Sequence, residues 1–140
     1  MNQETLSHKE VARKISWTLV FLLYSGAVFY FSIRPIQEGA PVIGITGMDK
    51  LVHAGEFTLY ALLGYGTIKY YIKQEKTIPT LAGVSIIYGT LTELSQLFFS
   101  YRSASILDWL ANILGITIGL IIIFLHGKRG SKTSRPPPTD

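Results

Sequence analysis

An uncharged run of 19 residues, at positions 15–33, constrains this chain more than any other feature of its sequence. The hydrocarbon core of a bilayer is about 30 Å thick, and a helix needs roughly 20 apolar residues to cross it. Three further apolar blocks follow, at residues 51–68, 79–101 and 106–125. Lipid offers no hydrogen-bond partner to backbone amides, and a strand would need only about ten alternating residues, so we expect these blocks to be helices.

The predicted fold class is an all-α membrane protein with four transmembrane helices, at about residues 15–33, 50–71, 79–99 and 106–125. The membrane domain covers residues 15–126 and follows a cytoplasmic N-terminal segment at residues 1–14. Residues 127–140 are basic and proline-rich, so we expect a disordered cytoplasmic tail. The first block is longer than the apolar part of a signal peptide and lacks a small-x-small cleavage site around Ser32 and Arg34. It is therefore predicted to be a retained anchor.

The orientation follows from the distribution of lysine and arginine. Ten of the 13 basic residues fall in the N-terminal segment, the second loop with its helix edge, and the tail: Lys9, Arg13, Lys14, Lys69, Lys73, Lys76, Lys128, Arg129, Lys132 and Arg135. The other two loops hold Arg34, Lys50 and Arg102. Because positive charge is retained on the inner side of membranes, both termini and the second loop are predicted to be cytoplasmic.

Composition excludes several classes of protein. The chain is 48% hydrophobic and only 16% charged, which excludes a disordered or fibrous protein. It has no cysteine, which excludes a disulfide framework, a thiolate nucleophile and a cysteine-ligated zinc site. The net charge is +4, but the basic residues lie at the edges of the apolar blocks, so we expect a membrane and no nucleic acid as partner.

Ionisable and amide side chains inside the predicted spans all fall in the outer half of the membrane. In and just before the second span, Asp49, His53 and Glu56 are spaced four and three residues apart and therefore share one helix face. Exposing such groups to lipid costs roughly 2.5 to 3.5 kcal/mol for each charged side chain, so we expect them to face one another around an outward-facing polar pocket. The predicted ligand-binding residues are Asp49, Lys50, His53, Glu56, Glu93, Gln96, Arg102, Asp108 and Asn112.

Local patterns predict how the helices begin and pack. Thr46-x-x-Asp49 and Ser105-x-x-Asp108 have the form of a helix-capping box, and Pro79 fits the first turn of the third helix. In the fourth helix a small residue recurs every four positions, at Ala111, Gly115 and Gly119. This small-residue stripe predicts a face that another helix approaches closely.

Four motifs that hold these polar residues resemble those of the VanZ-like family of small bacterial membrane proteins. They are Asp49-Lys50-x-x-His53-x-x-Glu56-Phe57, Glu93-x-x-Gln96-x-Phe98, Arg102-Ser103 and Asp108-Trp109-x-x-Asn112. The resemblance covers about residues 20–122. Because the founding member of that family is associated with resistance to the lipoglycopeptide teicoplanin, the resemblance implies a role in glycopeptide resistance or envelope homeostasis.

Three interpretations of the polar residues stay open. In the structural interpretation, the aspartates cap helices, Arg102 pairs with Glu93, and the amides hydrogen-bond between helices. In the binding interpretation, Lys50 and Arg102 receive an anionic head group or a peptide carboxylate, while the carboxylates and amides contact amines and hydroxyls.

In the enzymatic interpretation, His53 is an acid or base oriented by Glu56 or Glu93, and Lys50 and Arg102 stabilise a phosphoryl group. A metal site would be a special case of it, with the ligands His53, Glu56, Glu93 and Asp108. No nucleophile elbow or phosphate-binding loop is present in the sequence.

The sequence thus favours a non-enzymatic binder of an envelope lipid, a lipid-linked cell-wall precursor or a lipoglycopeptide. The alternative is a membrane-embedded enzyme acting on a phosphate-bearing lipid head group, with His53 and Glu93 as its catalytic residues. We expect no cofactor and no metal. Membrane lipids are the expected partners, and a homo-oligomer is compatible with the sequence.

Overall fold

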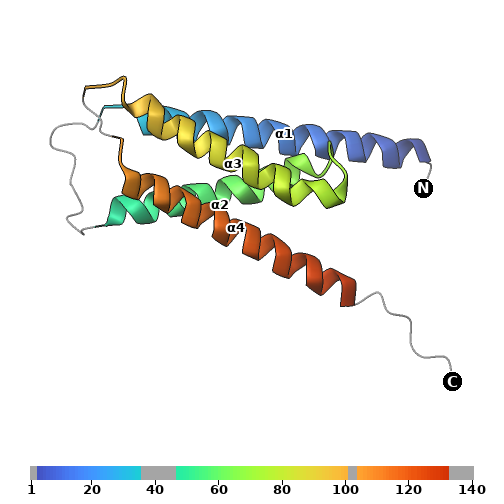
Figure 1. Cartoon of the computed structure of the whole chain (residues 1–140). Helices are drawn as coiled ribbons and strands as arrows, with labels where there is room; N and C mark the ends of the chain where they lie inside the picture. Colours follow the sequence, from blue (N-terminus) through green and yellow to red (C-terminus); the bar gives the residue numbers. More distant parts are fainter. Residues whose placement is uncertain (1–2, 36–46, 101–103, 133–140) are drawn as a thin grey trace.

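The computed structural model describes residues 3–35, 47–100 and 104–132. They form four helices and, within those ranges, no strand: α1 (Gln3–Ile33), α2 (Met48–Ile68), α3 (Gln74–Gln96) and α4 (Ile106–Lys132). The helices alternate in direction, so α1 and α3 finish at the end of the bundle where α2 and α4 begin, on the left of Figure 1. We call this the polar end. The all-helical prediction is confirmed.

Two of the helices are long and apolar enough to cross a membrane, by length and composition alone. They are the stretches Ser7–Ile33 of α1 and Ile106–Lys128 of α4. The other two are less apolar over a comparable length, because polar residues interrupt them: His53 and Glu56 in α2, and Glu93 and Gln96 in α3. Two of the four predicted spans therefore meet this criterion, and the four-span arrangement stays a prediction.

Two helices extend beyond the predicted boundaries at the ends of the chain. α1 starts at Gln3 rather than near residue 15. Its first turns hold good helix formers, and Glu10 and Lys14 stand in the favourable i, i+4 relation. α4 continues to Lys132, into the segment predicted to be disordered. Basic residues such as Lys128 near the carboxyl end of a helix are favoured by its dipole, and residues 133–140 lie outside the described ranges.

The inner boundaries also differ from the prediction. α2 runs from Met48 to Ile68 rather than over 50–71, and Gly47, with a φ of 93°, stands before it in a left-handed conformation that favours glycine. α3 runs from Gln74 to Gln96 rather than over 79–99, so Pro79 lies inside the helix and not at its start. Apolar blocks mark where lipid contact is expected, whereas helices continue through polar residues until a turn ends them.

The small-residue stripe of α4 packs against α2, as the sequence predicted. A methyl group added at Gly115 would overlap the backbone carbonyl of Ala54, and one added at Gly119 would lie 2.7 Å from the Cβ atom of Ala61. The Thr58 hydroxyl donates a hydrogen bond to the Gly115 carbonyl at 3.0 Å. The two backbones are therefore close enough for side chains on the first turns of both helices to meet at the polar end.

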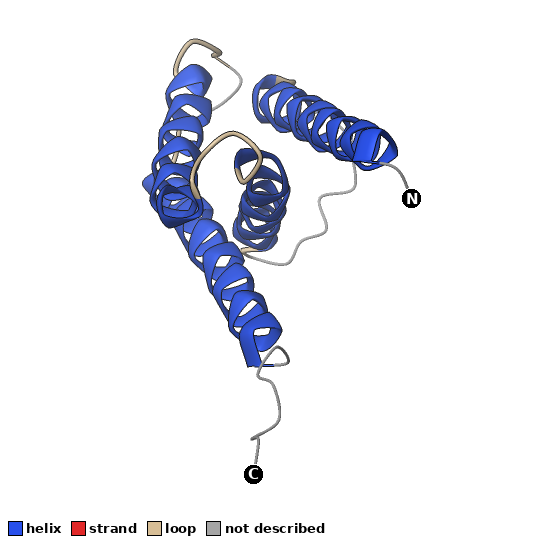
Figure 2. Ribbon diagram, turned by 90° about the vertical axis from the view of Figure 1, so that its right-hand side faces the viewer, coloured by secondary structure: helices blue, strands red, loops and turns tan. Residues whose placement is uncertain are grey.

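Aromatic residues hold the other two helices in place. The rings of Tyr60 in α2 and Tyr88 in α3 stack with centroids 4.7 Å apart. The Tyr24 hydroxyl of α1 donates to the Glu56 carbonyl at 3.0 Å, and the Tyr88 hydroxyl donates to the Ser25 carbonyl. Viewed along the bundle, α4 crosses the other helices at a slant, and its carboxyl half diverges from them (Figure 2).

Candidate functional site

The start of α4 is fixed by a cap that the sequence predicted. The Ser105 hydroxyl accepts a hydrogen bond from the Asp108 amide at 3.4 Å. This places the Asp108 side chain on the first turn, facing α2. At the start of α2 the residue before the helix is Gly47, which offers no side-chain cap. Thr46, the other predicted capping residue, lies outside the described residues.

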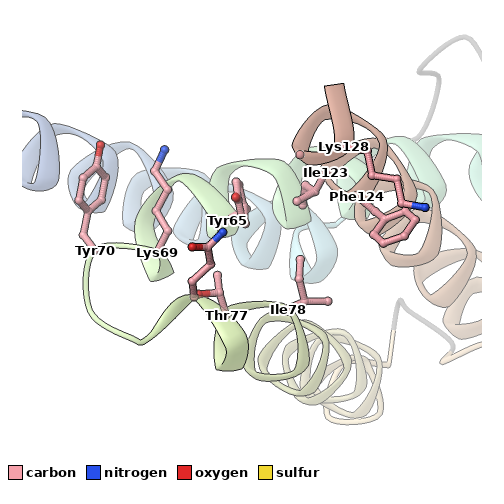
Figure 3. A pocket seen from close by; sticks show the side chains of 10 residues that line it. Tyr65, Lys69, Tyr70, Thr77, Ile78, Ile123, Phe124 and Lys128 are labelled. Atoms are coloured by element: carbon pink, nitrogen blue, oxygen red, sulfur yellow. The ribbon is translucent and has the colours of Figure 1, made fainter. Parts of the chain in front are cut away.

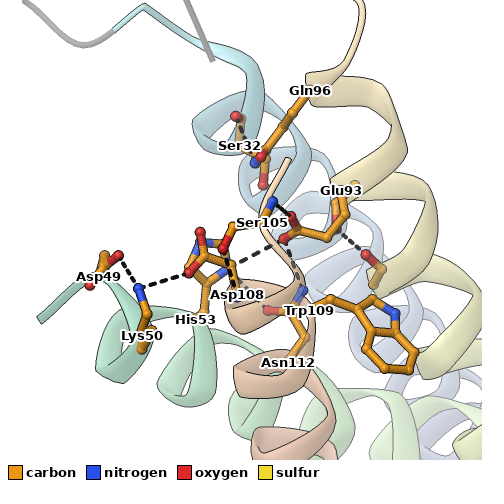
Figure 4. Close-up of polar contacts among 12 residues, drawn as sticks. Ser32, Asp49, Lys50, His53, Glu93, Gln96, Ser105, Asp108, Trp109 and Asn112 are labelled. Carbon is orange, nitrogen blue, oxygen red and sulfur yellow. Dashed lines mark hydrogen bonds and ion pairs between the residues drawn. The ribbon is translucent and has the colours of Figure 1, made fainter. Parts of the chain in front are cut away.

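The centre of the site is a buried network that joins three helices. The Asn112 amide of α4 donates to Oε1 of Glu93 in α3 at 3.3 Å, and its Oδ1 lies 3.0 Å from Nδ1 of His53 in α2. Oε2 of Glu93 accepts from the Ser105 amide at 3.3 Å. Asn112 is fully buried and Glu93 is 5% exposed. Figure 4 shows these side chains converging between α2, α3 and α4.

A second layer of charge lies nearer the surface of the polar end. The Lys50 ammonium is 2.6 Å from Oδ2 of Asp49 and 3.3 Å from Oδ1 of Asp108. The Asp108 contact lacks hydrogen-bond alignment and is an ion pair only. The hydrogen bond from Lys50 lowers the pKa of the exposed Asp49 carboxyl, which precedes the predicted second span. His53 lies 4.0 Å from a carboxylate oxygen of Glu93 and 4.0 Å from one of Asp108.

Beside the network is a half-open cavity of about 310 Å³, which we call the polar-end pocket. It is lined by Phe31, Ser32, Arg34, Asp49, Val52, His53, Glu56 and Gln96. The Gln96 amide donates to the Ser32 carbonyl at 3.3 Å and so joins α3 to α1. The Glu56 carboxyl is only partly exposed and, among the residues that the structure describes, has no hydrogen bond or ion pair.

The structure brings most of the predicted site residues together. Pairwise contacts link Lys50, His53, Glu93, Asp108 and Asn112 into one connected group, and Asp49 joins it through Lys50. Glu56 and Gln96 line the adjacent pocket. Arg102 lies outside the described residues, so neither its predicted pairing with Glu93 nor its predicted role toward an anion is described.

The contribution of α1 to the site was not predicted from the sequence. Arg34 and Ser32 line the polar-end pocket. The sequence alone indicated only a loop position for Arg34 and no cleavage site around Ser32. Arg34 lies over the Phe31 ring, with its guanidinium carbon 5.0 Å from the ring centroid. The sequence does contain a signal for this contribution, because Arg34 follows directly after an apolar span and is therefore expected at the same membrane depth as the start of α2.

The charge balance indicates what the site can bind. Lys50 is already held by two carboxylates, so the geometry does not favour its predicted role as receptor for an anion. In the pocket itself, Asp49 and Glu56 offer carboxylates, and Arg34 offers a guanidinium. This combination suits a head group with a cation or hydroxyls on one side and an anionic group on the other. Among the described residues, no three or more His, Asp or Glu side chains are arranged to hold a metal ion.

Comparison with known proteins shows which family the chain resembles. The family described as VanZ/LLP1 matches residues 3–127, which include α1, α2, α3 and most of α4. The chain is also 26% identical over 122 residues to the uncharacterized protein C11E3.10 of Schizosaccharomyces pombe. That alignment covers 87% of this chain and 70% of the yeast protein. No solved structure matches the chain significantly.

Proposed function

Because the chain belongs to the VanZ/LLP1 family, we propose that it is a four-span membrane protein whose polar end binds an envelope lipid, a lipid-linked precursor or a lipoglycopeptide. The observation that carries this proposal is the half-buried Glu56 carboxylate, which lines a cavity and has no hydrogen bond or ion pair among the described residues. An ionisable group at membrane depth is costly unless it has a partner, and a ligand supplies one.

The four-span arrangement is supported by the surface of the bundle. Large apolar side chains are exposed on all four helices, including those that fail the composition criterion. Examples are Leu23 at 74%, Leu59 at 43%, Ile87 at 61% and Leu114 at 56% exposure. A soluble monomer rarely exposes apolar area on every side, whereas lipid would cover it.

We expect both termini of the protein to lie in the cytoplasm, because ten of the 13 basic residues are on that side in the predicted topology. Reporter fusions at Lys76 and after Leu125 should give a cytoplasmic signal, and fusions at Gly44 and Ser103 an external one. An external signal at Lys76 would reverse the orientation and place the polar-end pocket on the inner side.

The pocket favours a zwitterionic or hydroxyl-bearing head group. An ammonium or hydroxyl would donate to Glu56 and Asp49, and a phosphate would meet Arg34. A lipid-linked precursor with amino sugars offers the same groups.

The test is native mass spectrometry of the purified protein with its co-purifying lipids. Glu56→Gln should keep the fold and the melting temperature but retain about tenfold less ligand, because a charge-assisted hydrogen bond to a ligand is lost. The matched control is Glu75→Gln, which removes a carboxylate from the exposed start of α3 at the opposite end. Equal ligand in the wild type and both variants would contradict the proposal.

One observation favours an enzyme as the second candidate: His53 stands between the carboxylates of Glu93 and Asp108, at 4.0 Å from each. A histidine so placed could move a proton to or from a lipid head group. His53→Gln separates the two functions. For an enzyme it should leave binding intact and stop turnover, so that intact substrate lipid accumulates on the variant. If the protein is a binder, the variant should hold the same lipid species as the wild type, in an equal or smaller amount.

In the cell, we propose that the protein contributes to teicoplanin resistance or to envelope homeostasis. Glu93→Gln removes the charge of the buried network and keeps its shape, although the amide has one acceptor oxygen where the carboxylate accepts from both Asn112 and Ser105. If the network serves a ligand or a proton, this variant should reach the membrane at normal abundance yet lose the phenotype, measured as teicoplanin susceptibility. Thr92→Val on the same helix is the control, and normal susceptibility in both Glu93→Gln and His53→Gln would leave only a structural role.

A further inference from the structure

A larger cavity lies at the opposite end of the bundle, away from the polar-end pocket. It has a volume of about 680 Å³, which is within the range of about 300–1,000 Å³ for small-molecule sites. It is bounded by the end of α2, the start of α3 and the diverging carboxyl half of α4 (Figure 3). Its walls include Tyr65, Lys69, Ile78, Ile123, Phe124 and Lys128. We call it the basic cavity.

The basic cavity is amphipathic. Ile78, Ile123 and Phe124 provide an apolar surface, whereas Lys69 and Lys128 stand on opposite sides (Figure 3). Its described lining contains no aspartate or glutamate. A surface that combines two ammonium groups with an apolar wall complements an amphiphile with a negative head group.

Both ammonium groups lie near aromatic rings. Lys69 Nζ is 5.1 Å from the Tyr70 ring centroid and 5.7 Å from that of Tyr65, and Lys128 Nζ is 4.3 Å from that of Phe124. Within the part of the chain that the structure describes, neither has a carboxylate partner. Ring faces attract a cation but leave its charge available to an anion, unlike the two carboxylates that hold Lys50.

The position of the cavity matches the boundary of a membrane. The apolar stretch of α4 ends at Lys128, one of the residues that line the cavity. A lipid phosphate lies at this depth, with its acyl chains directed back along the apolar part of the helix. The cavity is thus open at the level where head groups are available.

We propose that the basic cavity binds an anionic phospholipid, with the phosphate between Lys69 and Lys128 and an acyl chain against Ile78, Ile123 and Phe124. This second lipid site rests on the membrane embedding proposed above, but not on the ligand of the polar-end pocket. A choline head group would carry its own cation toward the two lysines, so phosphatidylcholine should bind less tightly than phosphatidylglycerol.

The experiment counts lipid bound to the purified full-length protein in neutral detergent by native mass spectrometry. The probes are phosphatidylglycerol, phosphatidylcholine and inorganic phosphate, and only the first should bind well. Lys69→Gln and Lys128→Gln should each weaken phosphatidylglycerol about fivefold, and the double variant at least tenfold, because each lysine near an anionic surface contributes comparably. No preference for phosphatidylglycerol over phosphatidylcholine would overturn the proposal.

The matched control is the double variant Lys73→Gln/Lys76→Gln. It removes the same charge from exposed lysines of the same loop and α3 start that do not line the cavity, so binding should be unchanged. Ile78→Trp fills the cavity without changing charge and should also abolish binding. An equal loss in the control, or full binding by Ile78→Trp, would contradict a site in this cavity. Any phosphatidylglycerol held in the polar-end pocket should be lost in Glu56→Gln but kept in Lys69→Gln/Lys128→Gln, so the failure of either lipid site can be recognised separately.

Discussion

Replacing Asn112 with leucine is expected to lower the melting temperature of the purified protein by on the order of 10 °C, which corresponds to about 2–3 kcal/mol. Asn112 is fully buried and contacts both Glu93, at 3.3 Å, and His53, at 3.0 Å. Leucine fits the volume but leaves the buried Glu93 Oε1 without its amide donor. A buried polar group that loses its partner retains its full desolvation cost.

Thermal unfolding in detergent measures this effect, with Thr117→Leu as the control on the same helix. Thr117 is exposed, and among the described residues its hydroxyl bonds only to the Ile113 carbonyl one turn earlier, so its replacement should leave the melting temperature nearly unchanged. The double variant Asn112→Leu/Glu93→Leu should be more stable than Asn112→Leu alone, because it removes the stranded carboxyl as well. A melting temperature of Asn112→Leu equal to that of the wild type would refute the network as a stabilising element.

Gly115→Leu is expected to have an effect of similar or greater size, about 3 kcal/mol of destabilisation, together with loss of ligand at the polar end. Even a methyl group at this position would overlap the Ala54 carbonyl, which is backbone and cannot rotate away. The helices α2 and α4 must then separate, and the Thr58 bond to the Gly115 carbonyl is lost. Since Asn112 and His53 lie close to this contact, their 3.0 Å interaction should be lost with it.

Gly83→Leu is the matched control, because nothing lies within 4 Å of the position that its Cβ would take. Here the gain in helix propensity, about 1 kcal/mol, should leave stability equal or improved. The readouts are the melting temperature in detergent and the amount of co-purified lipid. If both glycine variants behave alike, close packing of α4 on α2 does not position the site.

The sequence determined much of the local architecture. Apolar blocks predicted four helices, and the four-residue spacing of Ala111, Gly115 and Gly119 predicted the face of α4 that another helix approaches closely. The three-residue spacing of Ser105 and Asp108 predicted the hydrogen bond that caps the start of α4. Such features repeat with the 3.6-residue period of a helix or lie within one turn, so they need no knowledge of neighbouring helices.

Helix ends were less well predicted. Apolar blocks show which residues suit lipid, but a helix also tolerates charged residues well. For this reason α1 begins earlier than its apolar block, at Gln3, and α4 ends later than its block, at Lys132. Pro79 lies inside α3 for the same reason: the helix already begins at the polar residue Gln74, so about a turn and a half precedes the proline.

Which polar residues meet was decided only by the tertiary structure. Helical spacing placed Lys50 beside His53 on α2, but not between Asp49 and Asp108, where two carboxylates already hold its charge. It likewise did not show that the Glu56 carboxyl faces a pocket to which α1 contributes Arg34. A sequence period fixes the face of one helix, whereas the rotation and axial offset between helices come from how closely their backbones approach. In this protein those are set by contacts such as Gly115 on Ala54 and the Tyr60–Tyr88 stack, each of which joins residues distant in the sequence.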